Sequence, residues 1–248
     1  MPTLLAFIPH PDDESYAFGG LIALASRTAW TCHIECATYG EHGERHDGGP
    51  LDPNALADTR AAELEASCRI LGAEPPEFWG LPDGELRLHR GEQSRITSRI
   101  RALEPALILS LGPDGAYGHP DHIALYNWVT EAWHSLKTPA PPLLYAAFPK
   151  GLFLPQYEKC LPMLGDPPAP PRETIGTYPW HYTVSITTVA DTKRAAIDAH
   201  RSQLPGGEPE ALFPPGIIEE LMGEERYTDA SGTMSERVAD LLAALART

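Results

Sequence analysis

The segment FIPHPDDESYAFGG, residues 7–20, decides how the first part of the chain folds. It begins inside an apolar run over residues 3–8, TLLAFI, which predicts a short buried strand. Helical spacing of apolar residues starts at about Tyr16 and continues to Ser26. Charged groups at the end of a buried strand are costly unless a partner such as a metal ion compensates them. The segment therefore predicts a strand–helix junction that carries a ligand site. Its polar residues are His10, Asp12, Asp13 and Glu14.

Strand and helix patterns alternate along the rest of the chain. Repeated strand–helix units are typical of a mainly parallel sheet with helices on both faces. We expect a Rossmann-like α/β fold, with the site at the C-terminal edge of the strands. Strands are predicted at residues 32–38, 75–81, 106–111 and 142–148, and an edge or antiparallel strand at 181–189. Helices are predicted at residues 53–71, 95–104, 120–136, 191–204 and 233–245.

Capping residues predict where some helices begin and end. Asp52, followed by a proline, reads as an N-cap with proline at the first helical position, and Gly72 ends that helix. Asp191 is predicted to be the N-cap of the helix that follows it. Thr233 and Glu236 have the spacing of a capping box at the start of the last helix.

Composition limits the classes of partner. The chain has 19 basic and 34 acidic residues, and its net charge of −15 argues against nucleic acids and anionic membranes. No apolar run approaches the roughly 18 residues of a membrane span. No G-x-G-x-x-G or G-K-[ST] motif accompanies Gly19 and Gly20, so nucleotide binding is not expected.

The organisation of the chain reads as a single domain. We find no internal repeat and no domain linker, so residues 1–248 are expected to form one α/β domain, and the proline-rich residues 149–180 an excursion near the site. The four cysteines form no C-x-x-C pair and no secretory signal is visible, so we expect a cytoplasmic protein with reduced thiols. A homo-oligomer of any order is compatible with the sequence.

Two polar motifs follow two of the predicted strands. HPDDE, residues 10–14, comes after the first strand, and GHPDH, residues 118–122, comes after the strand at 106–111. His10 and Asp13 are three residues apart, as are His119 and His122, and residues so spaced share one face at a helix start. Three His and Asp ligands with an open position describe a catalytic zinc site. The same set suits non-haem iron(II), so these residues leave the metal open.

The two motifs together resemble the zinc-dependent N-deacetylases typified by the de-N-acetylase of N-acetylglucosaminyl-phosphatidylinositol (PIG-L, also called LmbE-like). The de-N-acetylases of the mycothiol and bacillithiol pathways are relatives in that family. Other segments match the family in the same order. They are TYGEHGE at 38–44, TRAAELEASCRILGAE at 59–74, GLPDGEL at 80–86 and KRAAIDAHRSQ at 193–203.

The resemblance implies a role for each residue of the two motifs. His10, Asp13 and His122 would bind zinc, and Asp12 would be the general base that takes a proton from the attacking water. His119, held by Asp121, would stabilise the developing oxyanion. Tyr117 would help to stabilise the same oxygen.

Substrate contacts also follow from the resemblance. Arg60 and Asp83 match the family positions expected to clamp sugar hydroxyls. Glu14 is expected to hydrogen-bond either a ligand or a backbone turn. Glu41 and Arg45 lie on the loop expected to overhang the sheet edge, and these residues leave open whether His200 packs behind the site or approaches it.

The implied function is zinc-dependent hydrolysis of an N-acetyl group from an N-acetylglucosamine-type substrate, a small sugar or glycoconjugate, to give a free amine and acetate. One alternative is a zinc amidase acting on another amide, such as a thiol S-conjugate or an acylated antibiotic sugar. A second alternative is a metal-binding protein without catalysis. The presence of Asp12 argues against the second alternative, because metal binding alone does not need it.

Overall fold

The computed structural model describes residues 1–90, 92–137, 139–162 and 169–247. Within this part, a sheet of seven strands in the order β3-β2-β1-β4-β5-β7-β6 forms the centre of the molecule. The first five strands are parallel, and β6 and β7 are joined to them in antiparallel pairing. The strands are β1 (Thr3–Ile8), β2 (Thr31–Cys36), β3 (Glu77–Phe78), β4 (Leu107–Ser110), β5 (Leu143–Ala146), β6 (Tyr182–Ser185) and β7 (Glu224–Asp229). The expected mostly parallel α/β fold is confirmed.

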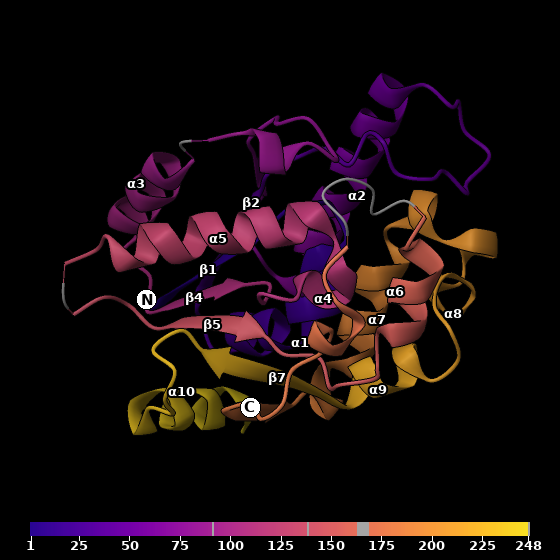
Figure 1. The fold of residues 1–248 in the computed structure, drawn as a ribbon. Helices are drawn as coiled ribbons and strands as arrows, with labels where there is room; N and C mark the ends of the chain where they lie inside the picture. The colour runs from indigo at the N-terminus through magenta and orange to yellow at the C-terminus, as the bar shows by residue number, and fades with distance from the viewer. Residues whose placement is uncertain (91, 138, 163–168, 248) are drawn as a thin grey trace.

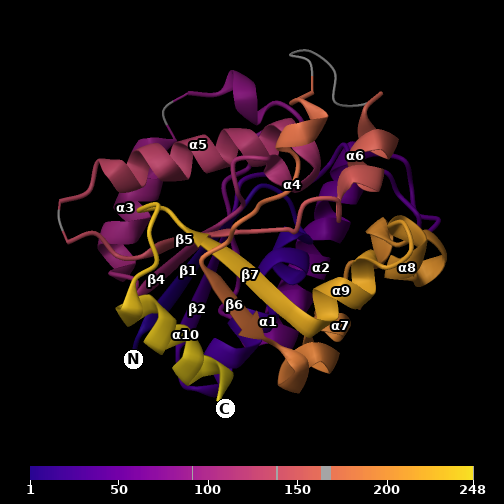
Figure 2. The ribbon, with the colours of Figure 1, turned by 60° about the horizontal axis from the view of Figure 1, so that its bottom comes forward.

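Helices cover both faces of the sheet (Figures 1 and 2). One face carries α1 (Asp13–Arg27), α2 (Pro53–Leu71), α7 (Ala190–Asp198), α9 (Ile217–Gly223) and α10 (Glu236–Ala246). The opposite face carries α3 (Gln93–Leu103) and α5 (Pro120–His134). Shorter helices α4 (Gly115–Gly118), α6 (Leu154–Cys160) and α8 (Pro209–Leu212) lie in the connections. None of the helices in the described ranges is both long and apolar enough to cross a bilayer.

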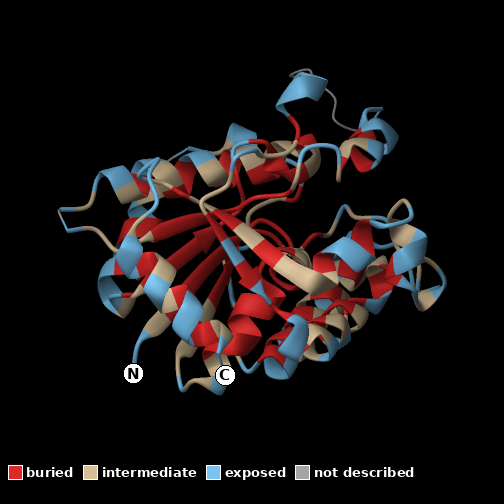
Figure 3. Ribbon diagram, turned by 90° about the horizontal axis from the view of Figure 1, so that it is seen from below, coloured by how far each residue is buried: buried red, intermediate tan, exposed pale blue. Residues whose placement is uncertain are grey.

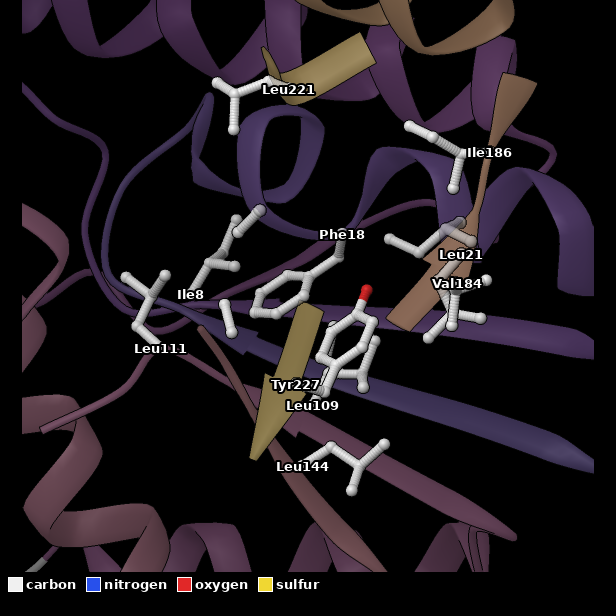
Figure 4. Close-up of a cluster of buried hydrophobic side chains, with 14 of the residues drawn as sticks. Ile8, Phe18, Leu21, Leu109, Leu111, Leu144, Val184, Ile186, Leu221 and Tyr227 are labelled. Atoms are coloured by element: carbon white, nitrogen blue, oxygen red, sulfur yellow. The ribbon is translucent and has the colours of Figure 1, made fainter. Parts of the chain in front are cut away.

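The uninterrupted apolar sequence of β1 follows from this double cover. Leu4, Ala6 and Ile8 face the core beneath α1, whereas Leu5 and Phe7 face the core beneath α3 and α5. A strand covered on both faces needs apolar residues at every position. Figure 3 shows the central strands buried along their length. Figure 4 shows the larger core, where Phe18 of α1 lies among side chains from β1, β4 and β7.

Helix ends agree only in part with the predicted caps. The Asp52 side chain accepts a hydrogen bond from the Asn54 amide at 3.2 Å, and Gly72 has the left-handed φ of 75° that favours glycine, so both predictions are confirmed. The capping box at the last helix is wrong. The N-cap there is Ser235, and its side chain makes no capping hydrogen bond. Asp191 lies in the first turn of α7 and is not its N-cap.

The last third of the chain departs most from prediction. The strand expected at residues 181–189 ends at Ser185, and a 3₁₀ turn, Thr187–Val189, follows. Helix α7 ends at Asp198, and the turn Arg201–Gln203 replaces its expected continuation to residue 204. Strand β7 was not predicted, because its buried positions hold Glu225, Tyr227 and Asp229 and the sequence EERYTD reads as polar. The excursion at 149–180 falls partly outside the described residues.

Candidate metal and active site

The two histidine motifs meet because their strands are neighbours in the sheet. β1 pairs in parallel with β4, with Ala6 opposite Leu109, so the chain leaves both strands at the same edge. His10 lies in the link from β1 to α1, His119 is the N-cap of α5, and His122 lies in the first turn of α5. The ring centroids of His10 and His119 are 4.8 Å apart, those of His119 and His122 4.7 Å, and those of His10 and His122 5.2 Å.

Asp13 stands between two of these histidines. Its Oδ2 lies 3.4 Å from Nδ1 of His10, and its Oδ1 lies 3.5 Å from Nε2 of His122. Although burial opposes ionisation, His122 and His10 lower the pKa of Asp13 to about 2, so the group is a carboxylate at neutral pH. An ionised carboxylate between two imidazoles is a suitable ligand arrangement for a divalent transition metal.

The other ring nitrogen of His10 faces two further carboxylates. Its Nε2 lies 3.1 Å from Asp83 Oδ1 and 3.3 Å from Asp121 Oδ2. Burial works against the charged ring, but Asp83, Asp121 and Asp13 raise the pKa of His10 well above its usual value. A carboxylate on the distal nitrogen of a ligating histidine fixes its tautomer and orientation. Asp83, expected to contact sugar, is therefore placed to hold His10.

His122 supplies the test of whether these residues fit a metal. Neither of its buried ring nitrogens makes a hydrogen bond of normal geometry in the described ranges, although the nearby backbone of Gly115 acts to raise the pKa of the ring. Burial lowers the pKa of His122 to about 4, so the ring is neutral and keeps a free lone pair. Buried polar atoms are normally paired, and an orphan imidazole beside an ionised carboxylate fits a metal ligand.

Two overlapping groups of side chains could hold a metal ion. In each group the ligand atoms all lie within 4.8 Å of one another. One group is His10, His119 and His122, and the other is His10, Asp83 and Asp121. Asp13 belongs to neither group, but it contacts the two histidines that were expected to share the ion with it.

Asp12 is held beside this cluster in a strained backbone conformation. Its φ of 117° and ψ of −30° are rare for a residue other than glycine, and strain of this kind persists only where neighbouring contacts enforce it. Its amide donates to Glu14 Oε2 at 3.0 Å, and its Oδ2 accepts from Arg60 Nη2 at 3.2 Å. Burial raises the pKa of Asp12 to about 7, against the opposing charge of Arg60.

Arg60 also binds the backbone around the site. Its guanidinium donates to the carbonyls of Gly40, at 2.8 Å, and of Pro11, and its side chain is buried. Gly40 has a φ of 66°, and a Cβ there would lie 2.2 Å from Arg60 Nη1. This contact explains the first glycine of the TYGEHGE segment, because only glycine leaves room for the arginine.

Glu14 lies beneath the site and does not line the cavity. Its Oε1 accepts from Ser67 Oγ at 2.5 Å and lies 2.7 Å from His200 Nε2, and all three side chains are fully buried. Its other oxygen, Oε2, accepts from the Asp12 amide, so the hydrogen bond to a backbone turn, one of the two contacts expected of Glu14, is observed. His200 packs behind the site, and although burial opposes it, Glu14 raises the pKa of His200.

His119 presents a hydrogen-bond donor to the cavity. Its Nδ1 accepts from the Asp121 amide at 3.2 Å, so the proton of the neutral ring lies on Nε2. Burial, with His122 nearby, lowers the pKa of His119 well below its usual value and keeps the ring neutral. The expected carboxylate–histidine pair takes a different form. The carboxylate of Asp121 accepts from the Gly84 and Leu86 amides at 2.7 and 3.1 Å and contacts His10.

Tyr117 lies next to these histidines, with its ring centroid 5.8 Å from that of His119 and 5.5 Å from that of His122. Burial raises the pKa of its hydroxyl, so the group stays protonated and can donate. Tyr117, the three histidines, Asp12 and Asp13 line one cavity of about 510 Å³. Arg60 and Asp83 also line it, whereas Glu41 and Arg45 do not.

A sequence model of GlcNAc-PI de-N-acetylases, PIG-L, matches residues 5–133 of the 248. The chain belongs to this family. The matched residues include both histidine motifs.

Two similar proteins span most of the PIG-L chain. The 1D-myo-inositol 2-acetamido-2-deoxy-alpha-D-glucopyranoside deacetylase of Rhodococcus jostii is 28% identical, over 96% of this chain and 94% of the relative. The probable N-acetyl-alpha-D-glucosaminyl L-malate deacetylase 2 of Bacillus subtilis is 30% identical, over 82% of this chain and 84% of the relative. The chain is thus related along nearly its whole length to deacetylases of sugar conjugates.

Solved structures share the fold. The N,N'-diacetylchitobiose deacetylase of Pyrococcus horikoshii has a TM-score of 0.67 at 22% identity and covers 92% of this chain and 83% of its own. The 4-carboxy-2-hydroxymuconate hydratase GalB of Pseudomonas putida has a TM-score of 0.69 at 21% identity and covers 95% of this chain and 99% of its own. Because a hydratase shares the architecture, the fold alone does not decide the reaction.

Sequence reasoning missed several residues of the site. Tyr16, Gln156 and Phe213 line the cavity, and His42 lies beside Asp83, with its Nδ1 2.9 Å from the Asp83 carbonyl. Tyr16 lies only three residues beyond Asp13, so the first turn of α1 was the available signal. No sequence signal marks Gln156 or Phe213, because the first lies in the short helix α6 and the second at the end of the short helix α8, both in connections whose path only the tertiary structure fixes.

Proposed function

We propose that this PIG-L protein is a zinc-dependent deacetylase. It hydrolyses the N-acetyl group of an N-acetylglucosamine unit within a sugar conjugate and yields a free amine and acetate. The observation that carries the proposal is the position of Asp12. Its carboxylate lies in the same cavity as the orphan imidazole of His122 and the ionised Asp13, within a backbone that Glu14 and Arg60 hold in a strained conformation.

His10, Asp13 and His122 would hold the zinc ion. Bound there, zinc supplies Lewis acidity that polarises the amide carbonyl and makes water more acidic. Asp83 and Asp121 fix the His10 ring through its Nε2. These five side chains together form the proposed metal site.

The proton transfers belong to Asp12. Its carboxylate accepts a proton from the water that attacks the carbonyl carbon and then gives that proton to the leaving nitrogen as the C–N bond breaks. A pKa raised by burial towards neutrality suits a group that performs both steps. Arg60, bonded to Asp12 Oδ2, orients the carboxylate.

The negative charge that develops on the carbonyl oxygen needs donors. His119, with its proton on Nε2, and Tyr117, with its hydroxyl protonated, both line the cavity and can supply such donors. Fixed donors of this kind stabilise an oxyanion without reorganisation.

Acetate release tests the proposal. The zinc-loaded protein is incubated with N-acetylglucosaminides, with and without a chelator, and its metal content is measured on the same sample. An Asp12→Asn variant is expected to bind zinc normally and to release no acetate, because it keeps the size of the side chain and cannot accept the proton. A variant as active as the parent would exclude Asp12 as the base.

A further inference from the structure

The cavity has two unlike sides. Loops after β2 and β3 supply polar groups, namely His42, Glu44 and His46 with the backbone of Gly84. The opposite side is mainly aromatic, with Gln156 and Lys159 of α6 among its rings, and comes from α1 and from the connections after β4 and β5 and beyond α7. Because the strand order places β2 and β3 on one side of β1 and places β4 and β5 on the other, the connections after β2 and β3 and those after β4 and β5 lie on opposite flanks of the histidine cluster.

The aromatic side is a continuous row of rings. The centroids of Tyr117 and Phe153 are 6.4 Å apart, those of Phe153 and Phe213 5.9 Å, and those of Phe213 and Tyr16 5.2 Å. Phe148 lies behind Phe153, at 4.7 Å. The row starts beside His122 and ends on α1, one turn after Asp13. It therefore borders the reaction centre directly.

Two polar atoms on this side have no partner. Tyr16 Oη and Gln156 Oε1 are buried without a hydrogen bond in the described ranges, and both residues line the cavity. Burial raises the pKa of Tyr16, so its hydroxyl remains a donor. An unsatisfied buried polar group destabilises the folded protein, so such a pair beside an aromatic row favours a ligand that satisfies it.

The geometry of a secondary amide indicates which of its two substituents faces the polar side of the cavity and which faces the aromatic side. The trans form is strongly favoured, so the groups on nitrogen and on the carbonyl carbon extend in opposite directions. A sugar on nitrogen has hydroxyls that require the polar flank. The acyl group then extends to the aromatic flank, and a methyl group fills little of a cavity of about 510 Å³.

We propose that the aromatic flank is an acyl-group subsite that accepts acyl chains larger than acetyl, with an apolar or aromatic body and a polar group reaching Tyr16 Oη or Gln156 Oε1. The proposal rests on the proposed function and extends its substrate class from N-acetylated amino sugars to those that carry larger acyl groups. Phe148, Phe153, Gln156 and Phe213 all lie outside the residues 5–133 that the family model matches, so that model does not describe this part of the subsite.

Binding of the product acids tests the subsite without catalysis. Acetate, butanoate, phenylacetate and 4-hydroxyphenylacetate are titrated into the zinc-loaded protein by calorimetry. Each buried methylene is expected to tighten binding about fourfold, and phenylacetate is expected to bind at least about tenfold more tightly than acetate. Phe213→Ala should remove most of the preference for phenylacetate over acetate. Tyr16→Phe should remove only the additional affinity of 4-hydroxyphenylacetate over phenylacetate. Phe78→Ala removes a ring that stacks on Tyr39 and does not line the cavity, so it is the matched control and should leave the preference unchanged.

Hydrolysis of N-acetyl, N-butanoyl and N-phenylacetyl glucosamine separates this proposal from the proposed function. If no acid is released from any of them but phenylacetate still binds through Phe213, the proposed reaction is wrong and the subsite stands. If acetate is released but phenylacetate binds no better than acetate, or binds equally well to Phe213→Ala, the subsite is overturned and the deacetylase stands.

Discussion

Glu14 and His200 form a fully buried pair, with Oε1 and Nε2 2.7 Å apart across 186 residues of sequence. The other oxygen of Glu14 accepts the amide of Asp12, so the pair fixes the backbone that carries the proposed base. His200 comes from the turn after α7, which packs against α1 and α2. The conformation of Asp12 therefore depends on a residue from the far end of the chain.

Substitution of Glu14 or His200 should slow the reaction without loss of bound zinc. We expect His200→Gln and Glu14→Gln to lower kcat by about 10–100-fold, the usual effect of losing a supporting contact, with little change in KM. Zinc content should remain at the parent level. Ser67→Ala removes one bond to Glu14 and serves as the milder control. A loss of zinc equal to the loss of kcat would show that the pair supports the metal site instead of Asp12.

Metal uptake should release a proton from His10. Its raised pKa means that the metal-free protein keeps this ring protonated at pH 7, whereas His122, with a pKa of about 4, is already neutral and Asp13 is already ionised. A ligating imidazole must be neutral, so apparent zinc affinity should rise with pH up to the pKa of His10. Calorimetry in buffers of different ionisation enthalpy should report about one proton released per ion.

The Asp83→Asn variant is the control for this proton release. Because Asp83 contributes to the raised pKa of His10, the variant should release fewer protons per zinc ion bound at pH 7. Unchanged proton release in Asp83→Asn would assign the proton to another group.

Loss of the donor at His119 should act mainly on the chemical step. We expect His119→Ala to lower kcat by about 10²–10³-fold, the typical effect of removing an oxyanion donor. The change in KM should be smaller, because the bond forms fully only in the transition state. Zinc analysis decides the competing assignment, since His119 also belongs to one of the groups that could hold a metal. Loss of zinc in this variant would make His119 a ligand.

A buried ion pair far from the cavity should dominate stability. Glu225 accepts from Lys193 Nζ at 2.8 Å, from the Gly20 and Leu21 amides at 2.7 and 2.9 Å, and from the Tyr227 hydroxyl at 2.7 Å. Lys193→Met leaves the carboxylate without its charged partner, and we expect a loss of about 3–5 kcal/mol in the free energy of unfolding by urea. Adding Glu225→Gln should recover part of the loss, and a double variant no better than the single one would show that the charge is not the cause.

The sequence was most informative where local pattern and chemistry coincide. Residues 3–8 are apolar at every position because both faces of β1 are covered, and the motifs beginning at His10 and His119 follow adjacent parallel strands. The alternation of strand and helix patterns predicted the mostly parallel sheet, and the two similar motifs after strands predicted that the histidines meet at its edge. The polar strand β7 escaped prediction because Glu225 and Asp229 are buried by partners that lie far away in the sequence.

The roles of single polar residues were harder to predict, because spacing does not say which way a side chain points. Glu14 is adjacent to Asp13 yet points away from the cavity, towards Ser67 and His200. Asp83 was expected to contact sugar, and the structure places it against His10. Both outcomes depend on tertiary contacts that one sequence does not contain.

The cavity is built by two separate parts of the chain. The proposed metal ligands and proton-transfer groups all lie before α5 ends, whereas three rings of the aromatic row follow β5. Exchange of the later segment between two relatives would then change which amide is chosen and leave the machinery that cleaves it in place. Selection could in this way alter substrate preference and hydrolytic rate independently within a single polypeptide.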